Sequence, residues 1–251
     1  INSGYGKVLN FWAYARIDTL NDDEMLKKML KAGIRWLALG IESSSREVRL
    51  EVSKGRFKDV KIKSVVDQIH DAGIEVMANY IFGLPGDTME TMQETLDLSL
   101  ELCTSGWNAY AAMALPGSQL YADAIAKGYR LPEKYSGYSF HSYDSVCSET
   151  DSLKPWQILK FRDEAFNKYH MNEKFLERIK SKYGEKQVDN INQLEDISIL
   201  KFEIIFAIIF LSFLTFRFFY MRTTQQSSLP SSTSKSHRFL AKFVHLSMKK
   251  I

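Results

Sequence analysis

The sequence has little cysteine, little net charge and no secretory signal. Its only two cysteines, Cys103 and Cys147, are too few for a disulfide scaffold or for a zinc module with CxxC spacing. The 33 Lys and Arg residues nearly balance 30 Asp and Glu residues, and a net charge of +3 gives no argument for nucleic-acid binding. No basic stretch followed by an apolar one opens the chain, so we expect a cytoplasmic protein.

The whole chain has 45% hydrophobic and 25% charged residues, which is typical of a globular protein. Up to about residue 198, apolar, charged and glycine residues are mixed as in a folded domain. The chain begins with Ile1 rather than Met, which we interpret as a processed start or a fragment. A length of 251 residues predicts one large domain, or one domain with an appendage.

The composition changes near residue 200. Residues 202–221 are almost entirely apolar, and a spanning helix needs roughly 20 such residues. Residues 223–251 hold basic residues but no acid, which would place that side in the cytoplasm. Three interpretations of residues 199–222 stay open: a membrane anchor, a buried helix or hairpin, and sequence that does not belong to the gene. We expect the basic, Ser/Thr-rich tail at 223–251 to be disordered.

Four apolar runs alternate with helical patterns before residue 130. The runs cover residues 8–15, 34–39, 74–82 and 107–115, and each is followed by a predicted helix. After the second run a short helical turn at about 45–51 comes first, and the longer helix behind it has a buried stripe of Ile62, Val65, Val66 and Ile69. Two of these helices are predicted to begin at the N-caps Asn21 and Asp87, with Glu24 and Glu90 at the reciprocal positions. Helices are also predicted over 156–170 and 172–183. Right-handed crossovers between such units predict a parallel α/β sheet, in a barrel, a partial barrel or a doubly wound fold.

Polar residues lie toward the carboxyl ends of these strands or follow them, where parallel α/β folds bind ligands. They are Arg16 and Asp18, then Glu42, then Asn79 with the Gly83–Gly86 turn, and finally the turn at 115–117. Glu42 is the most informative, because a carboxylate after a buried strand needs a partner, and Arg16 and Lys54 are the cationic candidates. The alternative is that Glu42 only caps the following turn and Arg16 neutralises it.

An ordered set of short motifs covers residues 10–120. It consists of Tyr14-Ala-Arg16-Ile-Asp18, Lys31-Ala-Gly33, Leu39-Gly40-Ile-Glu42-Ser43, Val52-Ser-Lys54-Gly55, Ala72-Gly73-Ile74, Phe82-Gly83-Leu-Pro-Gly86-Asp-Thr88 and Leu115-Pro-Gly117-Ser118. Each motif alone is common, but together and in this order they resemble the radical SAM superfamily. Tyr143 and the run at 161–166 are similar to members that carry an upstream cobalamin-binding domain.

The resemblance implies a partial (β/α) barrel over residues 1–130, truncated at its N-terminus, and a C-terminal loop and helical extension over 131–198. It implies a [4Fe–4S] cluster that binds S-adenosylmethionine. One electron, from a donor such as flavodoxin or ferredoxin, would cleave this cofactor to methionine and a 5′-deoxyadenosyl radical that attacks a small-molecule substrate. Cobalamin would be a further cofactor of the full-length protein.

The resemblance also implies roles for six residues. Glu42 would contact the nucleoside or the methionyl part of S-adenosylmethionine, and Lys54 would lie near its methionyl carboxylate. Arg16 would contact cofactor or substrate.

Of the other three, Asn79 would contact the ribose and Met113 would line the adenine. Gly83 belongs to a turn whose backbone would approach the ligand closely.

One departure from the family pattern is decisive. The family binds its cluster through CxxxCxxC, and this sequence has no such motif. We therefore interpret the chain as a fragment of a radical SAM enzyme. Two reactions of the whole enzyme stay open, cobalamin-dependent methyl transfer and another radical rearrangement, and we expect the chain to be unable to cleave S-adenosylmethionine alone. The alternatives are a non-catalytic binding module tethered through 202–221, and a non-redox barrel enzyme that uses Glu42 and Lys54 as acid and base.

Overall fold

The computed structural model describes residues 1–2, 4–20, 22–53 and 60–193. The expectations for Lys54, for the apolar segment 202–221 and for the tail 223–251 lie outside these residues. Residues Ile1–Ile197 form one compact unit. Within the described part of the chain, no helix combines the length and the apolar character that a bilayer crossing requires.

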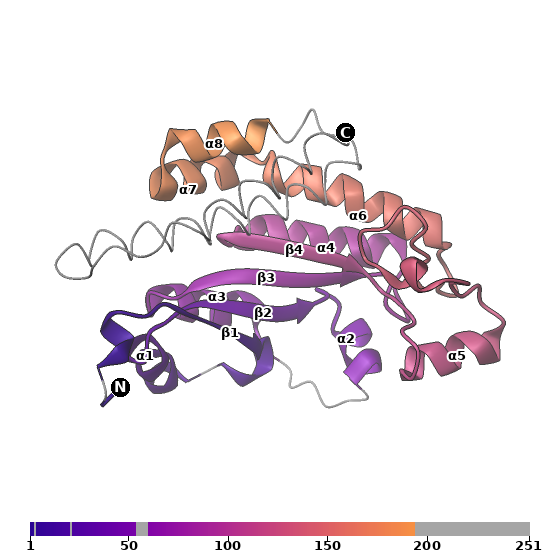
Figure 1. The fold of residues 1–251 in the computed structure, drawn as a ribbon, viewed down its shortest axis with the longest axis horizontal. Helices are drawn as coiled ribbons and strands as arrows, with labels where there is room; N and C mark the ends of the chain where they lie inside the picture. Colours follow the sequence, from indigo (N-terminus) through magenta and orange to yellow (C-terminus); the bar gives the residue numbers. More distant parts are fainter. Residues whose placement is uncertain (3, 21, 54–59, 194–251) are drawn as a thin grey trace, which may run out of the picture. The chain divides into compact units, whose positions relative to one another are not determined.

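A four-stranded parallel sheet forms the centre of the fold (Figure 1). Its strands are β1 (Phe11–Arg16), β2 (Ile34–Glu42), β3 (Glu75–Phe82) and β4 (Gly106–Ala111), and they lie in the order β1-β2-β3-β4. Each strand therefore neighbours the next one along the chain, as in a barrel, whereas a doubly wound sheet reverses its order at a switch point. The predicted α/β class is confirmed, and of the architectures left open the strand order fits the partial barrel.

Helices connect and flank these strands. They are α1 (Asp23–Lys31), α2 (Arg46–Ser53), α3 (Ile62–Asp71), α4 (Met89–Leu102), α5 (Gln119–Lys127), α6 (Pro155–His170), α7 (Glu173–Tyr183) and α8 (Glu185–Asn192). The sequence predicted all of these except α8, which is largely polar. Short 3₁₀ turns lie at Tyr5–Lys7, Ile17–Thr19 and Tyr135–Tyr138.

Two helices have their N-caps one residue later in the chain than predicted. Asp22 rather than Asn21 caps α1, and its carboxylate accepts hydrogen bonds from the backbone N–H groups of Glu24 and Met25. Thr88 rather than Asp87 caps α4, in a reciprocal pair with Thr91. Both corrections have the same cause, because neighbouring Asn, Asp and Thr residues are all good caps and the sequence does not rank them.

The core lies on one face of the sheet. Alternate residues of β3, namely Val76, Ala78, Tyr80 and Phe82, are buried, and they join a cluster with apolar residues of α1, α3, α4 and α6. The last helices share this core, because Trp107 of β4 stacks on Tyr169 of α6 with ring centroids 5.2 Å apart.

The opposite side is called the open face here. It carries Trp12, Tyr14 and Arg16 of β1, Trp36 and Gly40 of β2, Met77 and Asn79 of β3, and Asn108 and Tyr110 of β4. Trp12 and Tyr14 are 46% and 84% exposed, so this side of β1 is not covered as the core side is.

Candidate functional site

Four residues form a row across the open face, near the carboxyl ends of β1 and β2 and further back along β3 and β4. Arg16 pairs in register with Gly40, Gly40 with Asn79, and Asn79 with Asn108. Residues that pair in register on parallel strands share one face of the sheet. The sequence had singled out Arg16 and Asn79, and the structure places them in this common row.

Glu42 contributes its carboxylate to the same row. The register shifts between Gly40 and Glu42, and Glu42 has a left-handed backbone with φ of 68°. Its side chain folds back over Gly40, because a Cβ atom added to Gly40 would lie only 2.6 Å from Glu42 Oε1. The carboxylate therefore occupies the place that a side chain at position 40 would fill.

The environment of this carboxylate is unusual. Burial raises the pKa of Glu42 above its ordinary value, and burial is the one cause of the shift. Among the residues that the structure describes, none is recorded within hydrogen-bond or ion-pair distance of the Glu42 carboxylate. A half-buried, unpaired carboxylate costs folding free energy, and such groups concentrate at functional sites.

The loop after Glu42 is held by its own contacts. The hydroxyl oxygen of Thr95 on α4 accepts a hydrogen bond from Ser44 N–H at 3.0 Å and lies 3.2 Å from the hydroxyl oxygen of Ser43. Arg49 of α2 is only 6% exposed, and its Nη1 donates to the carbonyls of Ser43 and Ser44 at 2.6 and 2.7 Å. In the sequence Arg49 looks like one more charged residue on a helix surface, so nothing there marks it as a buried anchor of this loop.

Arg16 has a different ion-pair partner from the expected one. Its guanidinium binds Asp18 through two hydrogen bonds, at 2.9 Å from Nε and 2.5 Å from Nη2, and Asp18 is 3% exposed. The interpretation that Arg16 neutralises Glu42 is therefore wrong. Asp18 is two residues away in the chain and already fixed in a 3₁₀ turn, so it is the nearer partner.

The carboxamide of Asn79 has a fixed orientation. Its Nδ2 donates to the carbonyls of Met77 and Leu39, at 3.1 and 3.4 Å. Its Oδ1 accepts from Nδ2 of Asn108 at 3.3 Å, and the same nitrogen of Asn108 donates to the hydroxyl oxygen of Tyr110. Asn108 was missed from the sequence because it lies inside an apolar run.

Two other predicted residues in the described part of the chain, Gly83 and Met113, follow β3 and β4. Gly83 has φ of +78°, and a Cβ atom there would lie 2.6 Å from Cδ1 of Ile158, so this glycine permits close packing of α6. Met113 is 8% exposed and follows β4. Their predicted ligand contacts, and that of Lys54, stay predictions.

Asp87 stabilises the Gly83–Gly86 turn instead of capping α4. Its carboxylate accepts from Leu84 N–H at 2.9 Å and from the Thr91 hydroxyl at 2.8 Å. Burial raises the pKa of Asp87, and these hydrogen bonds oppose that rise.

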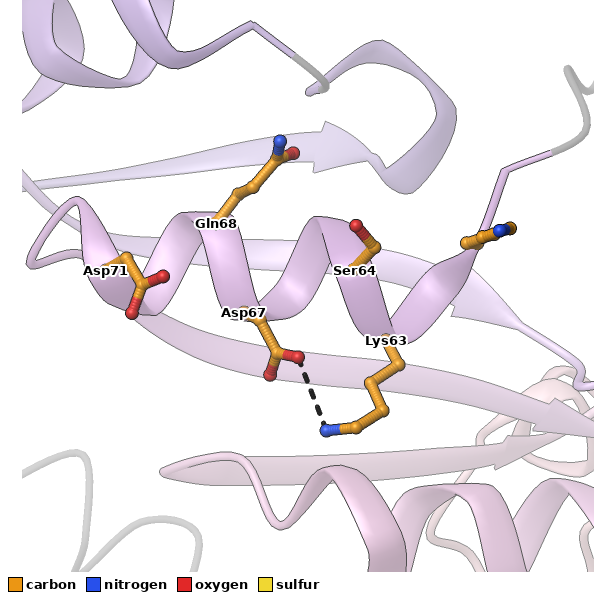
Figure 2. A pocket seen from close by; sticks show the side chains of 6 residues that line it. Lys63, Ser64, Asp67, Gln68 and Asp71 are labelled. Carbon is orange, nitrogen blue, oxygen red and sulfur yellow. Dashed lines mark ion pairs between the residues drawn. The ribbon is translucent and has the colours of Figure 1, made fainter.

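A hollow of 470 Å³ lies along one side of α3, and Figure 2 shows the polar side chains that line it. Lys63 pairs there with Asp67 at 3.3 Å, an exposed pair four residues apart on one helix. The lining residues all belong to α3 and the residue before it, so this hollow is a helix surface and has no connection with the row.

The residues do not fit an iron–sulfur cluster. Such clusters are held by several cysteine thiolates, and the chain has two cysteines, both buried. Burial raises the pKa of both thiols, that of Cys147 to about 12, so neither is poised to bind iron. Within residues 1–193, apart from the gaps in the description, no three His, Cys, Asp or Glu side chains converge as metal ligands.

Part of this chain is similar to a known protein family and to several of its members. Residues 12–99 match the radical SAM superfamily. The anaerobic magnesium-protoporphyrin IX monomethyl ester cyclase of Rubrivivax gelatinosus is 24% identical over 64% of this chain and 28% of its own length. The cytidylyl-2-hydroxyethylphosphonate methyltransferase of Streptomyces wedmorensis is 27% identical over 45% of this chain and 22% of its own.

Among solved structures, the radical S-adenosylmethionine methyltransferase TsrM of Kitasatospora setae, with cobalamin and a [4Fe–4S] cluster bound, is similar. It is 22% identical, with a TM-score of 0.42, over 50% of this chain and 25% of that one. The chain thus spans a minor part of each of these relatives. The matched segment carries Arg16, Glu42 and Asn79, and its match to the radical SAM superfamily agrees with the resemblance that the ordered motifs predicted.

Proposed function

We propose that this chain binds S-adenosylmethionine on the open face of its sheet, as the cofactor-binding part of a radical SAM enzyme. The observation that carries the proposal is the carboxylate of Glu42, held over Gly40 without a partner among the described residues. It lies at the strand ends of a segment that matches the superfamily.

The chemistry of the row suits this ligand. Glu42 offers a carboxylate, and Asn79 can offer only its oxygen, because both hydrogens of its Nδ2 have backbone acceptors. S-adenosylmethionine carries ribose hydroxyls and an ammonium group that donate hydrogen bonds, and a sulfonium charge that a carboxylate attracts. The two acceptors, Glu42 and Asn79, therefore complement the hydrogen-bond donors and the sulfonium charge of this ligand.

The proposal assigns binding and orientation to these residues. Reductive cleavage would require the electron that a [4Fe–4S] cluster supplies, from a donor such as flavodoxin or ferredoxin, and the described residues do not fit that cluster. Arg16, Lys54, Gly83 and Met113 are proposed as further contacts of the cofactor.

Methyl transfer to a small molecule, with cobalamin as second cofactor, is the proposed reaction of the whole enzyme. It is favoured because relatives named methyltransferases occur among the similar proteins, including the bacteriochlorophyllide d C-8(2)-methyltransferase of Chlorobaculum tepidum.

Calorimetric titration of the 251-residue chain with S-adenosylmethionine and S-adenosylhomocysteine tests the proposal. Glu42→Gln should weaken binding by about 10- to 100-fold, since a hydrogen bond to a charged group contributes ~1.5–3 kcal/mol. Glu94→Gln is the matched control, because Glu94 is exposed on α4. No binding by the wild-type chain, or equal binding by Glu42→Gln, would overturn the proposal.

Gly40→Ala provides a second perturbation that leaves the carboxylate chemically intact. The new methyl group would lie 2.6 Å from Glu42 Oε1, so the flexible end of Glu42 must move off the row. Binding should weaken as in Glu42→Gln, while the urea midpoint should change little, because Gly40 has no left-handed backbone. Unchanged affinity would show that the position of the carboxylate does not matter.

A further inference from the structure

A short hydrogen-bonded relay runs along β4 on the open face. Asn108 donates from a single nitrogen to Oδ1 of Asn79 and to the hydroxyl oxygen of Tyr110. The ring of Tyr110 in turn packs on Phe140, with centroids 4.9 Å apart and planes at 54°. The relay therefore connects the row to the segment between α5 and α6.

The far end of this relay is fixed as well. The backbone carbonyl of Phe140 accepts a hydrogen bond from Nη1 of Arg162 at 2.9 Å, and Arg162 lies on α6 and pairs with Asp163 at 2.6 Å. The position of Tyr110 is thus defined both by its own strand and by a segment anchored on α6.

The relay determines which atom Asn79 can present. An isolated carboxamide can turn over and exchange its oxygen and nitrogen. Here an exchange would point Oδ1 of Asn79 at the carbonyls of Leu39 and Met77, and would point its Nδ2 at the donating nitrogen of Asn108. Both contacts would be repulsive, so the two strands together hold the oxygen toward Asn108, with one lone pair left for a ligand.

We propose that Asn108 and Tyr110 are positioning residues that fix the carboxamide of Asn79, so that it accepts a hydrogen bond from a ribose hydroxyl of the bound nucleoside. This inference rests on the proposed binding of S-adenosylmethionine, which it deepens. It gives β4, and through Phe140 the segment before α6, a role in recognising the ligand.

The first test needs no ligand. The side-chain amide hydrogens of Asn79 should exchange slowly with solvent in nuclear magnetic resonance spectra, because both have backbone acceptors, and their signals are assigned by their loss in Asn79→Asp. Asn108→Asp replaces the donor by an acceptor of the same shape and should speed this exchange at least about tenfold. Tyr110→Phe should speed it less, because it leaves the ring packing on Phe140 intact.

Asn167→Asp is the matched control, since Asn167 is exposed on α6, and it should leave the exchange rate unchanged. Retained slow exchange in Asn108→Asp would overturn the positioning role. This result does not depend on whether the chain binds any nucleoside.

The second test is a cycle between residue and ligand. S-adenosylhomocysteine and its 2′-deoxy and 3′-deoxy analogues are titrated into the wild-type chain and Asn108→Asp. The variant should bind the parent ligand about 2- to 12-fold more weakly, the range of one neutral hydrogen bond, and should bind one deoxy analogue as the wild type does. An equal loss for all three ligands would mark a general structural effect and overturn the inference. Absence of binding to the wild-type chain would instead refute the proposed function, and the exchange test would still decide the role of Asn108.

Discussion

Replacing Glu42 by Gly should stabilise the protein. Glu42 has φ of 68°, a backbone region that disfavours residues with a side chain, and its carboxylate is half-buried with burial raising its pKa. Neither property helps the chain to fold. If both exist because Glu42 serves a ligand, then removing them must increase the free energy of unfolding.

The magnitude follows from opposing terms. A left-handed backbone costs a residue with a side chain about 1–2 kcal/mol, and the greater freedom of Gly in the unfolded chain costs about 0.5–1 kcal/mol. The backbone alone therefore predicts a gain of up to about 1.5 kcal/mol, and loss of the desolvated carboxylate adds to it. Asn tolerates this backbone better than most residues, so Glu42→Asn should gain a part of the same stability.

Urea unfolding at pH 7 measures the series Glu42→Gly, Glu42→Asn, Glu42→Ala and Glu42→Gln. Glu42→Ala and Glu42→Gln keep the left-handed backbone and lose the charge, so they report the carboxylate alone, and the difference between Gly and Ala reports the backbone. The slope of the unfolding free energy against urea concentration should be equal across the series. A wild-type protein more stable than Glu42→Ala would show that the carboxylate supports the fold, and the reasoning that reserves it for a ligand would fail.

Three further predictions concern the same unit. Burial raises the folded-state pKa of Glu42, so protonated Glu42 costs no stability below the unfolded pKa of about 4.3, and stability is lost as pH rises through the higher folded pKa. The urea midpoints of wild type and Glu42→Gln should therefore coincide near pH 4, and the variant should be the more stable at pH 7. A difference that does not change with pH would contradict this. Gly83→Ala should destabilise the chain by about 2–4 kcal/mol, because the new methyl group would clash with Ile158 and the backbone has a positive φ. Gly117→Ala is the control, since Gly117 also has a positive φ but open space around it, and it should cost about 1–2 kcal/mol in the same urea assay. Equal losses would refute the packing role of Gly83. Anaerobic incubation of the 251-residue chain with iron and sulfide should give no cluster absorption and no bound iron after desalting, and stoichiometric iron would show that the two cysteines suffice.

The periodicity of apolar residues predicted most of the helices and strands. Ile62, Val65, Val66 and Ile69 were predicted as the buried stripe of a helix, and all four are buried in α3. The pattern succeeds because burial on one helix face selects apolar residues at this spacing. It fails for α8, where Ile191 is the buried residue in a polar segment and the hydrophobic signal is too weak to show a helix.

Pairing was harder to predict than position. The sequence placed Arg16 and Glu42 at strand ends, but it could not show that Arg16 pairs with Asp18 two residues away. The local 3₁₀ turn makes this choice, and no periodicity reports it. Asn108 was missed for a related reason, since its meaning depends on its register with Asn79 across the sheet.

The strain at Glu42 is held in place by its neighbours and not by its own side chain. The buried guanidinium of Arg49 donates charge-assisted hydrogen bonds to the carbonyls of Ser43 and Ser44, and Thr95 accepts from Ser44 N–H. These contacts fix the loop whatever residue stands at position 42. A glycine there would satisfy the same backbone without a desolvated charge, so stability alone does not explain a glutamate. The loop does not need the Glu42 side chain for folding, yet it holds the Glu42 carboxylate over the row. Ligand binding therefore accounts for Glu42 better than loop structure does.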